Sequence, residues 1–246
     1  MQITHRTVLV VGGTSGIGRG LAQRFVDAGS TVVLGGRQPR PQEGFDTVPI
    51  DVTDPGSVLR ARDLVLDAHP DLDVVVTMSG VMLTEDLRDP AHIAAAETTI
   101  ATNLLGTIRV VDAFTPHLVA RGAGTVLTVS SGIAFLPFPL MPSYAASKAG
   151  VHAYTEALRA QLAGTGVEVA EIVPPAVATA GQEEVNPAAL PLAGYLDEVM
   201  GLLAADPTPA EVLVEGVQGH RWAERDGTYA DLVARRSQAL STLPGR

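Results

Sequence analysis

The chain has 246 residues, 46% of them hydrophobic, and a formal net charge of −10. This length and apolar content suit one large globular domain and exclude a largely disordered chain, and the acidic balance argues against a general binder of nucleic acid or anionic membranes. Because there is no cysteine, disulfides and thiolate metal sites are excluded. We find neither an apolar run of membrane-spanning length nor a signal peptide, and therefore expect a soluble, cytoplasmic protein.

Short β-branched runs alternate with longer stretches of helical apolar spacing. In chain order, the predicted elements are strand 7–11, helix 17–29, strand 31–35, strand 47–51, helix 57–69, strand 73–78, helix 91–118, strand 124–130, helix 143–162 and strand 167–173. Continuous apolar strands that alternate with helices indicate a parallel sheet covered on both faces. The predicted fold is therefore α/β: a doubly wound parallel sheet of the Rossmann type, in three α/β/α layers, forming a single domain over 1–246.

The region after the last predicted strand is less regular. The Pro- and Ala-rich stretch 174–209 is expected to be a loop-and-helix excursion within the domain, and 176–206 is a candidate lid over the substrate. No clear seventh strand is recognisable near the C-terminus. The tail 240–246 is expected to fray.

The first strand is followed by the glycine-rich turn "GGTSGIG" at 12–18. A doubly wound sheet binds a dinucleotide at this place, with the backbone N–H groups and the positive end of the first helix facing the pyrophosphate. The spacing differs from G-x-G-x-x-G, and a tight turn without a ligand is the alternative. The residues predicted to contact the cofactor here are Gly12, Thr14, Ser15, Gly16, Ile17 and Gly18.

The end of the second strand bears on which dinucleotide is bound. An acidic residue there would hold the ribose hydroxyls of NAD, but the sequence reads "VLGGRQPR" at 33–40, with Arg37 just past the strand and Arg40 close behind. A guanidinium matches the oxygens of a 2′-phosphate. We therefore expect NADP(H) to be preferred, with NAD(H) as an alternative. If these arginines bind no ligand, they are ordinary solvated charges of a loop.

A possible acid–base group lies at the start of the helix at 143–162. Tyr144 and Lys148 are four residues apart and share one helix face, and an ammonium near a phenol favours the phenolate and lowers the pKa of the tyrosine. Ser131 follows the fifth strand, at the carboxyl edge of the sheet, where it can bond a carbonyl oxygen. A surface tyrosine packed beside a lysine stem is the alternative.

Taken together, these motifs resemble the classical short-chain dehydrogenase/reductase family, and most closely a DltE-like branch of it. The matching segments are "VGGTSGIG" (11–18), "DVTD" (51–54), "TNLLG" (102–106), "SSG" (130–132) thirteen residues before Tyr144, and "PPAVAT" (174–179). Three motifs depart from the family: Val11 replaces a threonine, the family's N-N-A-G is "TMSG" (77–80), keeping only Gly80, and Pro175 replaces a glycine. The hydroxyls of Thr77 and Ser79 are expected to replace part of the lost asparagine.

The resemblance implies roles for particular residues. Asp51 and Val52 would contact the adenine, Val177 and Thr179 would lie near the nicotinamide carboxamide, and Asn103 would support a relay water beside the lysine. The implied catalytic set is Asn103, Ser131, Tyr144 and Lys148, and the cofactor set adds Gly80, Tyr144 and Lys148 to the residues above. No metal is implied.

The implied reaction is reversible hydride transfer between NADP(H) and a small carbonyl or alcohol. The alternative function is a non-catalytic NADP-binding sensor on the same fold. The family also implies a homodimer or homotetramer through the helices at 91–118 and 143–163. Six residues are candidates for lining an apolar substrate pocket, with loop cover over the core as the alternative: Leu83, Phe135, Phe138, Leu140, Met141 and Tyr195.

Overall fold

A computed structural model describes residues 1–179 and 189–245. Its main sheet has seven strands in the order β3-β2-β1-β4-β5-β6-β9, and every neighbouring pair is parallel. The strands of this sheet are β1 (Thr7–Val11), β2 (Thr31–Gly36), β3 (Asp46–Pro49), β4 (Val74–Thr77), β5 (Gly124–Val129), β6 (Val167–Ile172) and β9 (Glu211–Val212). The predicted doubly wound α/β fold in a single domain is confirmed.

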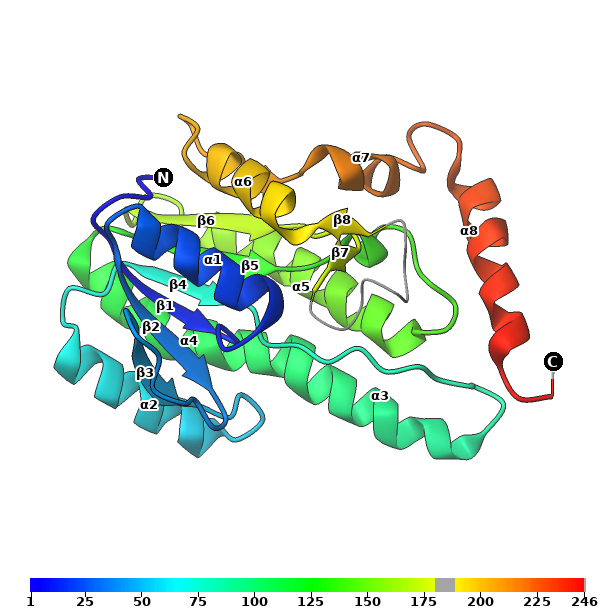
Figure 1. Cartoon of the computed structure of the whole chain (residues 1–246), viewed down its shortest axis with the longest axis horizontal. Helices are drawn as coiled ribbons and strands as arrows, with labels where there is room; N and C mark the ends of the chain where they lie inside the picture. Colours follow the sequence, from blue (N-terminus) through cyan, green and yellow to red (C-terminus); the bar gives the residue numbers. More distant parts are fainter. Residues whose placement is uncertain (180–188, 246) are drawn as a thin grey trace.

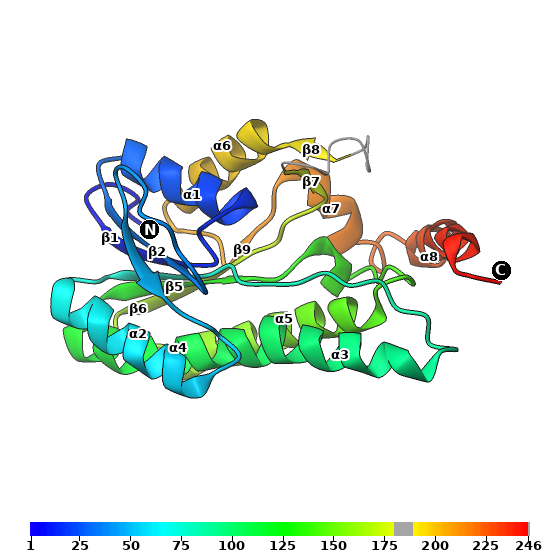
Figure 2. The ribbon, with the colours of Figure 1, turned by 60° about the horizontal axis from the view of Figure 1, so that its bottom comes forward.

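Helices cover both faces of the sheet (Figures 1 and 2). One layer contains α1 (Gly16–Asp27), α6 (Leu192–Leu203) and α7 (Glu215–Arg221), and the other contains α2 (Pro55–Ala68), α4 (Gly106–Arg121) and α5 (Pro142–Gln161). A parallel strand needs a crossover connection to its neighbour, and helices provide these crossovers except between β2 and β3, which residues 37–45 connect. The carboxyl ends of all the strands therefore meet at one edge of the sheet.

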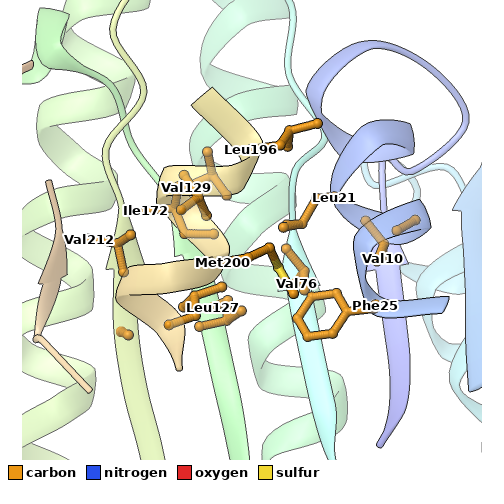
Figure 3. Packing of buried hydrophobic residues seen from close by; sticks show 14 of the residues in the cluster. Val10, Leu21, Phe25, Val76, Leu127, Val129, Ile172, Leu196, Met200 and Val212 are labelled. Carbon is orange, nitrogen blue, oxygen red and sulfur yellow. The ribbon is translucent and has the colours of Figure 1, made fainter. Parts of the chain in front are cut away.

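The central strands are buried on both sides, and alternate residues enter separate cores. In β1, Val8 and Val10 pack in the core beneath α1 and α6, while Leu9 and Val11 pack in the core beneath α2 and α4. Figure 3 shows the first core, where Phe25 of α1 and Met200 of α6 lie over the strands. This two-sided burial explains why the strands read as unbroken apolar runs.

The C-terminal part of the sheet corrects the sequence analysis, which recognised no seventh strand. Residues Glu211 and Val212 form β9 and pair with Glu171 and Ile172 of β6. The strand is missed because two residues are too few to show a periodic pattern. The Asp206–Pro207 peptide bond before it is cis.

The long helix predicted at 91–118 is divided in the structure. It consists of a 3-10 turn η1 (Pro90–His92), α3 (Ile93–Thr99), the π-helical turn η2 (Ile100–Leu105) and α4. Asn103 lies inside the π-helical turn. Such turns occur mostly as local insertions within α-helices, often at functional sites, and an apolar pattern does not announce them.

Beyond the sixth strand the structure describes several short elements. A small two-stranded sheet joins β7 (Val177–Ala178) to β8 (Leu190–Pro191), and α8 (Tyr229–Ser237) and the 3-10 turn η4 (Gln238–Thr242) end the described chain. Residues 180–188 of the predicted lid lie outside the described residues. In the described part of the chain, no helix combines the length and apolar composition that crossing a bilayer requires.

The core beneath α1 leads to a prediction about stability. Phe25 is fully buried between α1 and the sheet, so Phe25→Ala should lower the free energy of unfolding by about 3–5 kcal/mol. Leu64→Ala removes a side chain that is 55% exposed, and it should change that free energy by less than about 1 kcal/mol. Urea unfolding followed by circular dichroism measures both, and equal losses would contradict this description of the core.

Candidate active site

A cavity of about 940 Å³ opens along the carboxyl edge of the sheet. This volume lies within the range of small-molecule and cofactor sites. Most of the predicted site residues line it: Gly12, Thr14, Ser15, Gly16, Ile17, Gly18, Arg37, Asp51, Val52, Gly80, Ser131, Tyr144, Lys148, Val177 and Thr179. Asn103 is the exception, because it is fully buried behind the cavity wall. The structure thus brings together residues from widely separated parts of the chain.

The glycines of the first turn serve packing as well as access. Gly12 has φ +90°, and a Cβ there would lie 2.5 Å from the backbone nitrogen of Ser79, so only glycine lets the turn lie against the segment after β4. A Cβ on Gly18 would lie 2.4 Å from the carbonyl oxygen of Gly12. At Gly16 the nearest atom to such a Cβ is a methyl of Thr179 at 3.5 Å, so the space before this part of the turn is open.

The first turn of α1 is suited to an anion. Ser15 at its N-cap makes no side-chain hydrogen bond to the helix. The first N–H groups of the helix are therefore not capped by this side chain and are available to a ligand. These groups and the helix dipole favour a phosphate at this end of the cavity. An open cradle at Gly16 above an uncapped helix end fits the pyrophosphate of a dinucleotide.

The polar groups predicted to contact the adenosine half of the dinucleotide line the part of the cavity next to the ends of β2 and β3. Arg37 is exposed at the end of β2, and both Arg37 and Asp51 line the cavity. The backbone N–H and the hydroxyl of Thr53 donate to one oxygen of Asp51, at 2.9 and 2.7 Å. These two hydrogen bonds, with a smaller contribution from Arg37, lower the pKa of Asp51. Asp51 is therefore a carboxylate at neutral pH.

Three chemical groups converge where α5 meets the end of β5. Ser131 is the second residue after β5, and Tyr144 and Lys148 occupy successive turns of α5. The ammonium of Lys148 donates to the carbonyl oxygen of Val129 at 2.8 Å, and it lies 5.8 Å from the centre of the Tyr144 ring. The hydroxyl of Ser131 interacts with the side chain of Tyr144. The spacing of Tyr144 and Lys148 thus does place both side chains on the cavity wall.

The electrostatics of this group correct one expectation. Burial raises the pKa of Tyr144, because it disfavours the phenolate more than the Ser131 hydroxyl stabilises it. The predicted lowering of this pKa was therefore wrong for the chain's own residues. Burial lowers the pKa of Lys148 to about 8, although the buried Glu171 opposes this change. At neutral pH the site contains a protonated phenol beside a charged ammonium.

The side chain of Asn103 connects three segments of the described structure through hydrogen bonds. Its side-chain amide donates to the carbonyl of Val81 at 2.9 Å and to the Ser147 hydroxyl at 3.1 Å, and its side-chain oxygen accepts from the N–H of Val81 at 2.8 Å. It thereby joins the π-helical turn to the loop after β4 and to α5. A Cβ on Gly80 would lie 3.3 Å from the Asn103 side-chain oxygen and 3.8 Å from the Lys148 ammonium, so these three residues are closely packed.

The substitutions in the "TMSG" motif have different structural outcomes. The hydroxyl of Thr77 is buried, and no described residue bonds it, so it does not replace the contacts of an asparagine. Met78 and Ser79 line the cavity next to Gly80. The expectation that the Thr77 hydroxyl replaces contacts of the lost asparagine is therefore wrong for contacts with other residues of the chain. The expectation for Ser79 concerns a contact with a ligand and stays a prediction.

A buried carboxylate holds the start of α5. Glu85 accepts a hydrogen bond from the backbone N–H of Ser143 at 2.9 Å and from the Ser143 hydroxyl at 2.8 Å. His92 lies 3.3 Å from the same carboxylate. Because Ser143 precedes Tyr144, Glu85 fixes the helix end from which the phenol projects. No sequence motif had pointed to Glu85.

Two further residues that no sequence motif indicates, His220 and Arg236, line the cavity from the C-terminal segment. Conversely, none of the six candidate pocket residues is among the described residues that line it. Tyr195 is in the core beneath α6, and Phe135 packs edge-on to His152 with ring centres 4.7 Å apart. Residues near the C-terminus reach the site only through the tertiary fold, which no local pattern reveals.

A histidine and two glutamates near α5 have the composition of a metal site. His152, Glu156 and Glu211 place ligand atoms within 4.8 Å of one another. However, Arg221 donates to both oxygens of Glu211, at 2.6 and 2.9 Å, and Glu171 binds the Nδ1 of His152 at 2.8 Å. The guanidinium opposes a cation here, and we read the cluster as an ion-pair network.

Comparison with known proteins decides the family. A sequence profile described as short chain dehydrogenase matches residues 6–189. The chain belongs to the short-chain dehydrogenase family. Its members are oxidoreductases that use nicotinamide dinucleotides, and the cavity's open cradle, Arg37 and the uncapped end of α1 fit such a group. The matched range ends well before His220 and Arg236.

Individual relatives agree with this assignment. The uncharacterized oxidoreductase DltE of Bacillus subtilis is 33% identical over 187 residues, which cover 73% of this chain and 74% of that protein. Sulfoacetaldehyde reductase 2 of Chromohalobacter salexigens is 33% identical, over 68% of this chain and 71% of that protein. A short chain dehydrogenase from Burkholderia cenocepacia, solved in complex with NADP, is 25% identical with a TM-score of 0.82, covering 95% of this chain and 99% of that one.

The buried ammonium leads to a prediction about pH. Lys148 has a pKa of about 8 in the folded chain and an ordinary value of about 10.4 when unfolded. The unfolded chain therefore binds more protons between these values, so the contribution of Lys148 to stability rises with pH. The free energy of unfolding of the wild type, minus that of Lys148→Met, should increase by about 2–3 kcal/mol from pH 7 to pH 10. Urea unfolding at each pH measures it, and a constant difference would contradict the burial of a charged ammonium.

Proposed function

We propose that this chain is an NADP(H)-preferring oxidoreductase that interconverts a carbonyl compound and the corresponding alcohol, with Tyr144 as the general acid and base. The observation that carries the proposal is the continuity of one cavity, from Arg37 past the glycine turn to Ser131, Tyr144 and Lys148. Family membership supplies the reaction class. NADP in the related structure from Burkholderia cenocepacia supports the choice of dinucleotide.

The chain's own residues divide the dinucleotide site into three parts. The glycine turn and the N-terminus of α1 would hold the pyrophosphate. Arg37 would bind a 2′-phosphate, and Asp51 and Val52 would contact the adenine. Gly80, Val177 and Thr179 line the cavity and would face the nicotinamide half. When bound, the dinucleotide supplies or accepts the hydride.

The catalytic residues act on the substrate oxygen. In the reducing direction, Ser131 orients the carbonyl and Tyr144 donates its proton to the oxygen. The raised pKa of Tyr144 keeps the phenol protonated at neutral pH, ready to donate. Once the proton has left, the charge of Lys148 stabilises the phenolate. The bond from Lys148 to the Val129 carbonyl keeps the ammonium in place through the cycle.

The segment 176–206 is proposed as a substrate lid. Val177 and Thr179 at its start line the cavity, and β7 near this start pairs with β8. Closure over the substrate would exclude water during hydride transfer. The C-terminal half of the segment, α6, is packed against α1 and the sheet and forms a fixed base.

Tyr144→Phe tests the acid–base role. This change removes the proton and leaves the ring, so NADPH-dependent carbonyl reduction should fall by about 100-fold or more. NADPH binding, followed by its fluorescence, should change less than about threefold. Tyr154→Phe, on the same helix and outside the cavity, is the matched control. Turnover close to wild type in Tyr144→Phe would end the assignment, and wild-type binding of NADPH without reduction of any carbonyl would favour the sensor function.

Arg37→Ala tests the choice of dinucleotide. Loss of a charge-assisted bond to a 2′-phosphate should weaken NADPH binding by about tenfold or more and leave NADH binding nearly unchanged. Arg40→Ala removes the same charge from the same loop at a residue that does not line the cavity, and it should have little effect. Tighter binding of NADH than NADPH by the wild type would overturn the preference.

A further inference from the structure

The cavity has a positively charged end that the family motifs do not explain. Arg37 lies at the adenosine end and Lys148 is engaged by Val129, whereas His220 and Arg236 line the cavity from the C-terminal segment. Figure 1 shows that α8, which carries Arg236, stands apart from the layers of helices on either side of the sheet. Arg236 nevertheless turns back to this cavity.

The guanidinium of Arg236 is held in place by neutral partners. One terminal nitrogen donates to the carbonyl of Leu136, and the other lies 3.1 Å from the Nε2 of His220. No carboxylate of the described residues pairs with it. A guanidinium has five N–H donors, so these two contacts leave donors and a full positive charge uncompensated. Such a charge in a chain of net charge −10 is suited to an anionic ligand.

His220 is positioned beside the catalytic loop. A Cβ on Gly132 would lie 2.8 Å from the Nδ1 of His220 and 2.8 Å from a methyl of Val217, so α7 packs directly on the residue after Ser131. Arg221 fixes this part of α7 through its bonds to Glu211 and its position 4.4 Å from the Phe135 ring centre. The charged group of Arg236 is thus tied to the loop that carries Ser131.

The protonation of His220 adds a second donor. Burial and the charge of Arg236 lower the pKa of His220 to about 4, so the imidazole is neutral at pH 7. Arg236 can only donate, so the Nε2 of His220 accepts and its proton is on Nδ1. That N–H and the unused N–H groups of Arg236 form a cluster of donors with one positive charge.

We propose that the substrate is a small aldehyde or ketone that also carries an anionic group such as a carboxylate, and that Arg236 with His220 binds this group. The proposal rests on the proposed function, because it places the reacting carbonyl at Ser131 and Tyr144. The anion would stay at the end of the cavity formed by α7 and α8. Arg236 is then a specificity-determining residue from outside the segment that the family profile matches.

Kinetics with matched substrates test the proposal. NADPH-dependent reduction of 4-oxobutanoate, 5-oxopentanoate and 6-oxohexanoate is compared with that of butanal, pentanal and hexanal. At least one oxo acid should have a kcat/KM about tenfold or more above that of its neutral counterpart. Arg236→Ala should remove that advantage. It should lower the kcat/KM of the oxo acid by about 10- to 100-fold and that of the neutral aldehyde by less than about threefold. Arg235→Ala, the exposed neighbour on the same helix, should leave both unchanged.

A binding measurement separates this proposal from the proposed function. NADP⁺-loaded protein is titrated by calorimetry with pentanoate and with pentanamide, which differ in charge but hardly in shape. Pentanoate should bind more tightly, and Arg236→Ala should weaken only pentanoate, by about tenfold or more. Neutral aldehydes reduced as well as the acids, or pentanoate binding that does not depend on Arg236, would overturn the inference and leave the oxidoreductase function standing. Binding of pentanoate as expected, without reduction of any carbonyl, would support the anion site and count against the proposed reaction.

Discussion

The structure depends on the burial of both faces of one parallel sheet. Because alternate residues of the central strands enter different cores, as Val8 and Leu9 do, these strands must be covered by helices on two sides. The crossovers that provide this cover return the chain to the same end of the sheet each time. The carboxyl ends therefore gather along one edge, and the loops that follow them form a single continuous cavity. Its location is thus a consequence of how the core is packed.

At that edge of the sheet, packing contacts fix the position of α5 and of the polar side chains that it carries. Glu85 holds its first turn, Asn103 reaches it through Ser147, and Lys148 is anchored on the last residue of β5. The same burial that fixes Lys148 also lowers its pKa and raises that of Tyr144. A phenol that keeps its proton beside an ammonium poised near neutrality is suited to giving up a proton and then regaining it. Burial thus both fixes the positions of Lys148 and Tyr144 and shifts their pKa values.

Much of this was predictable because the relevant signals are local. The alternation of apolar strands and helices indicated the sheet, and the spacing of Tyr144 and Lys148 indicated a shared helix face. The π-helical turn at Asn103 and the two-residue strand at Glu211 lack a periodic signal. The pKa of Tyr144 was predicted in the wrong direction because the motif shows a neighbouring charge and conceals the degree of burial. Glu85, His220 and Arg236 reach the site only through the tertiary fold, far from any motif.

The helix that carries Arg236 is attached in an unusual way. None of the α8 side chains is buried, and Arg236 is joined to the body through a backbone carbonyl and a histidine. Changes along this helix therefore hardly disturb either core. A substitution on this helix can therefore alter the groups that line one end of the cavity while the free energy of unfolding stays nearly constant.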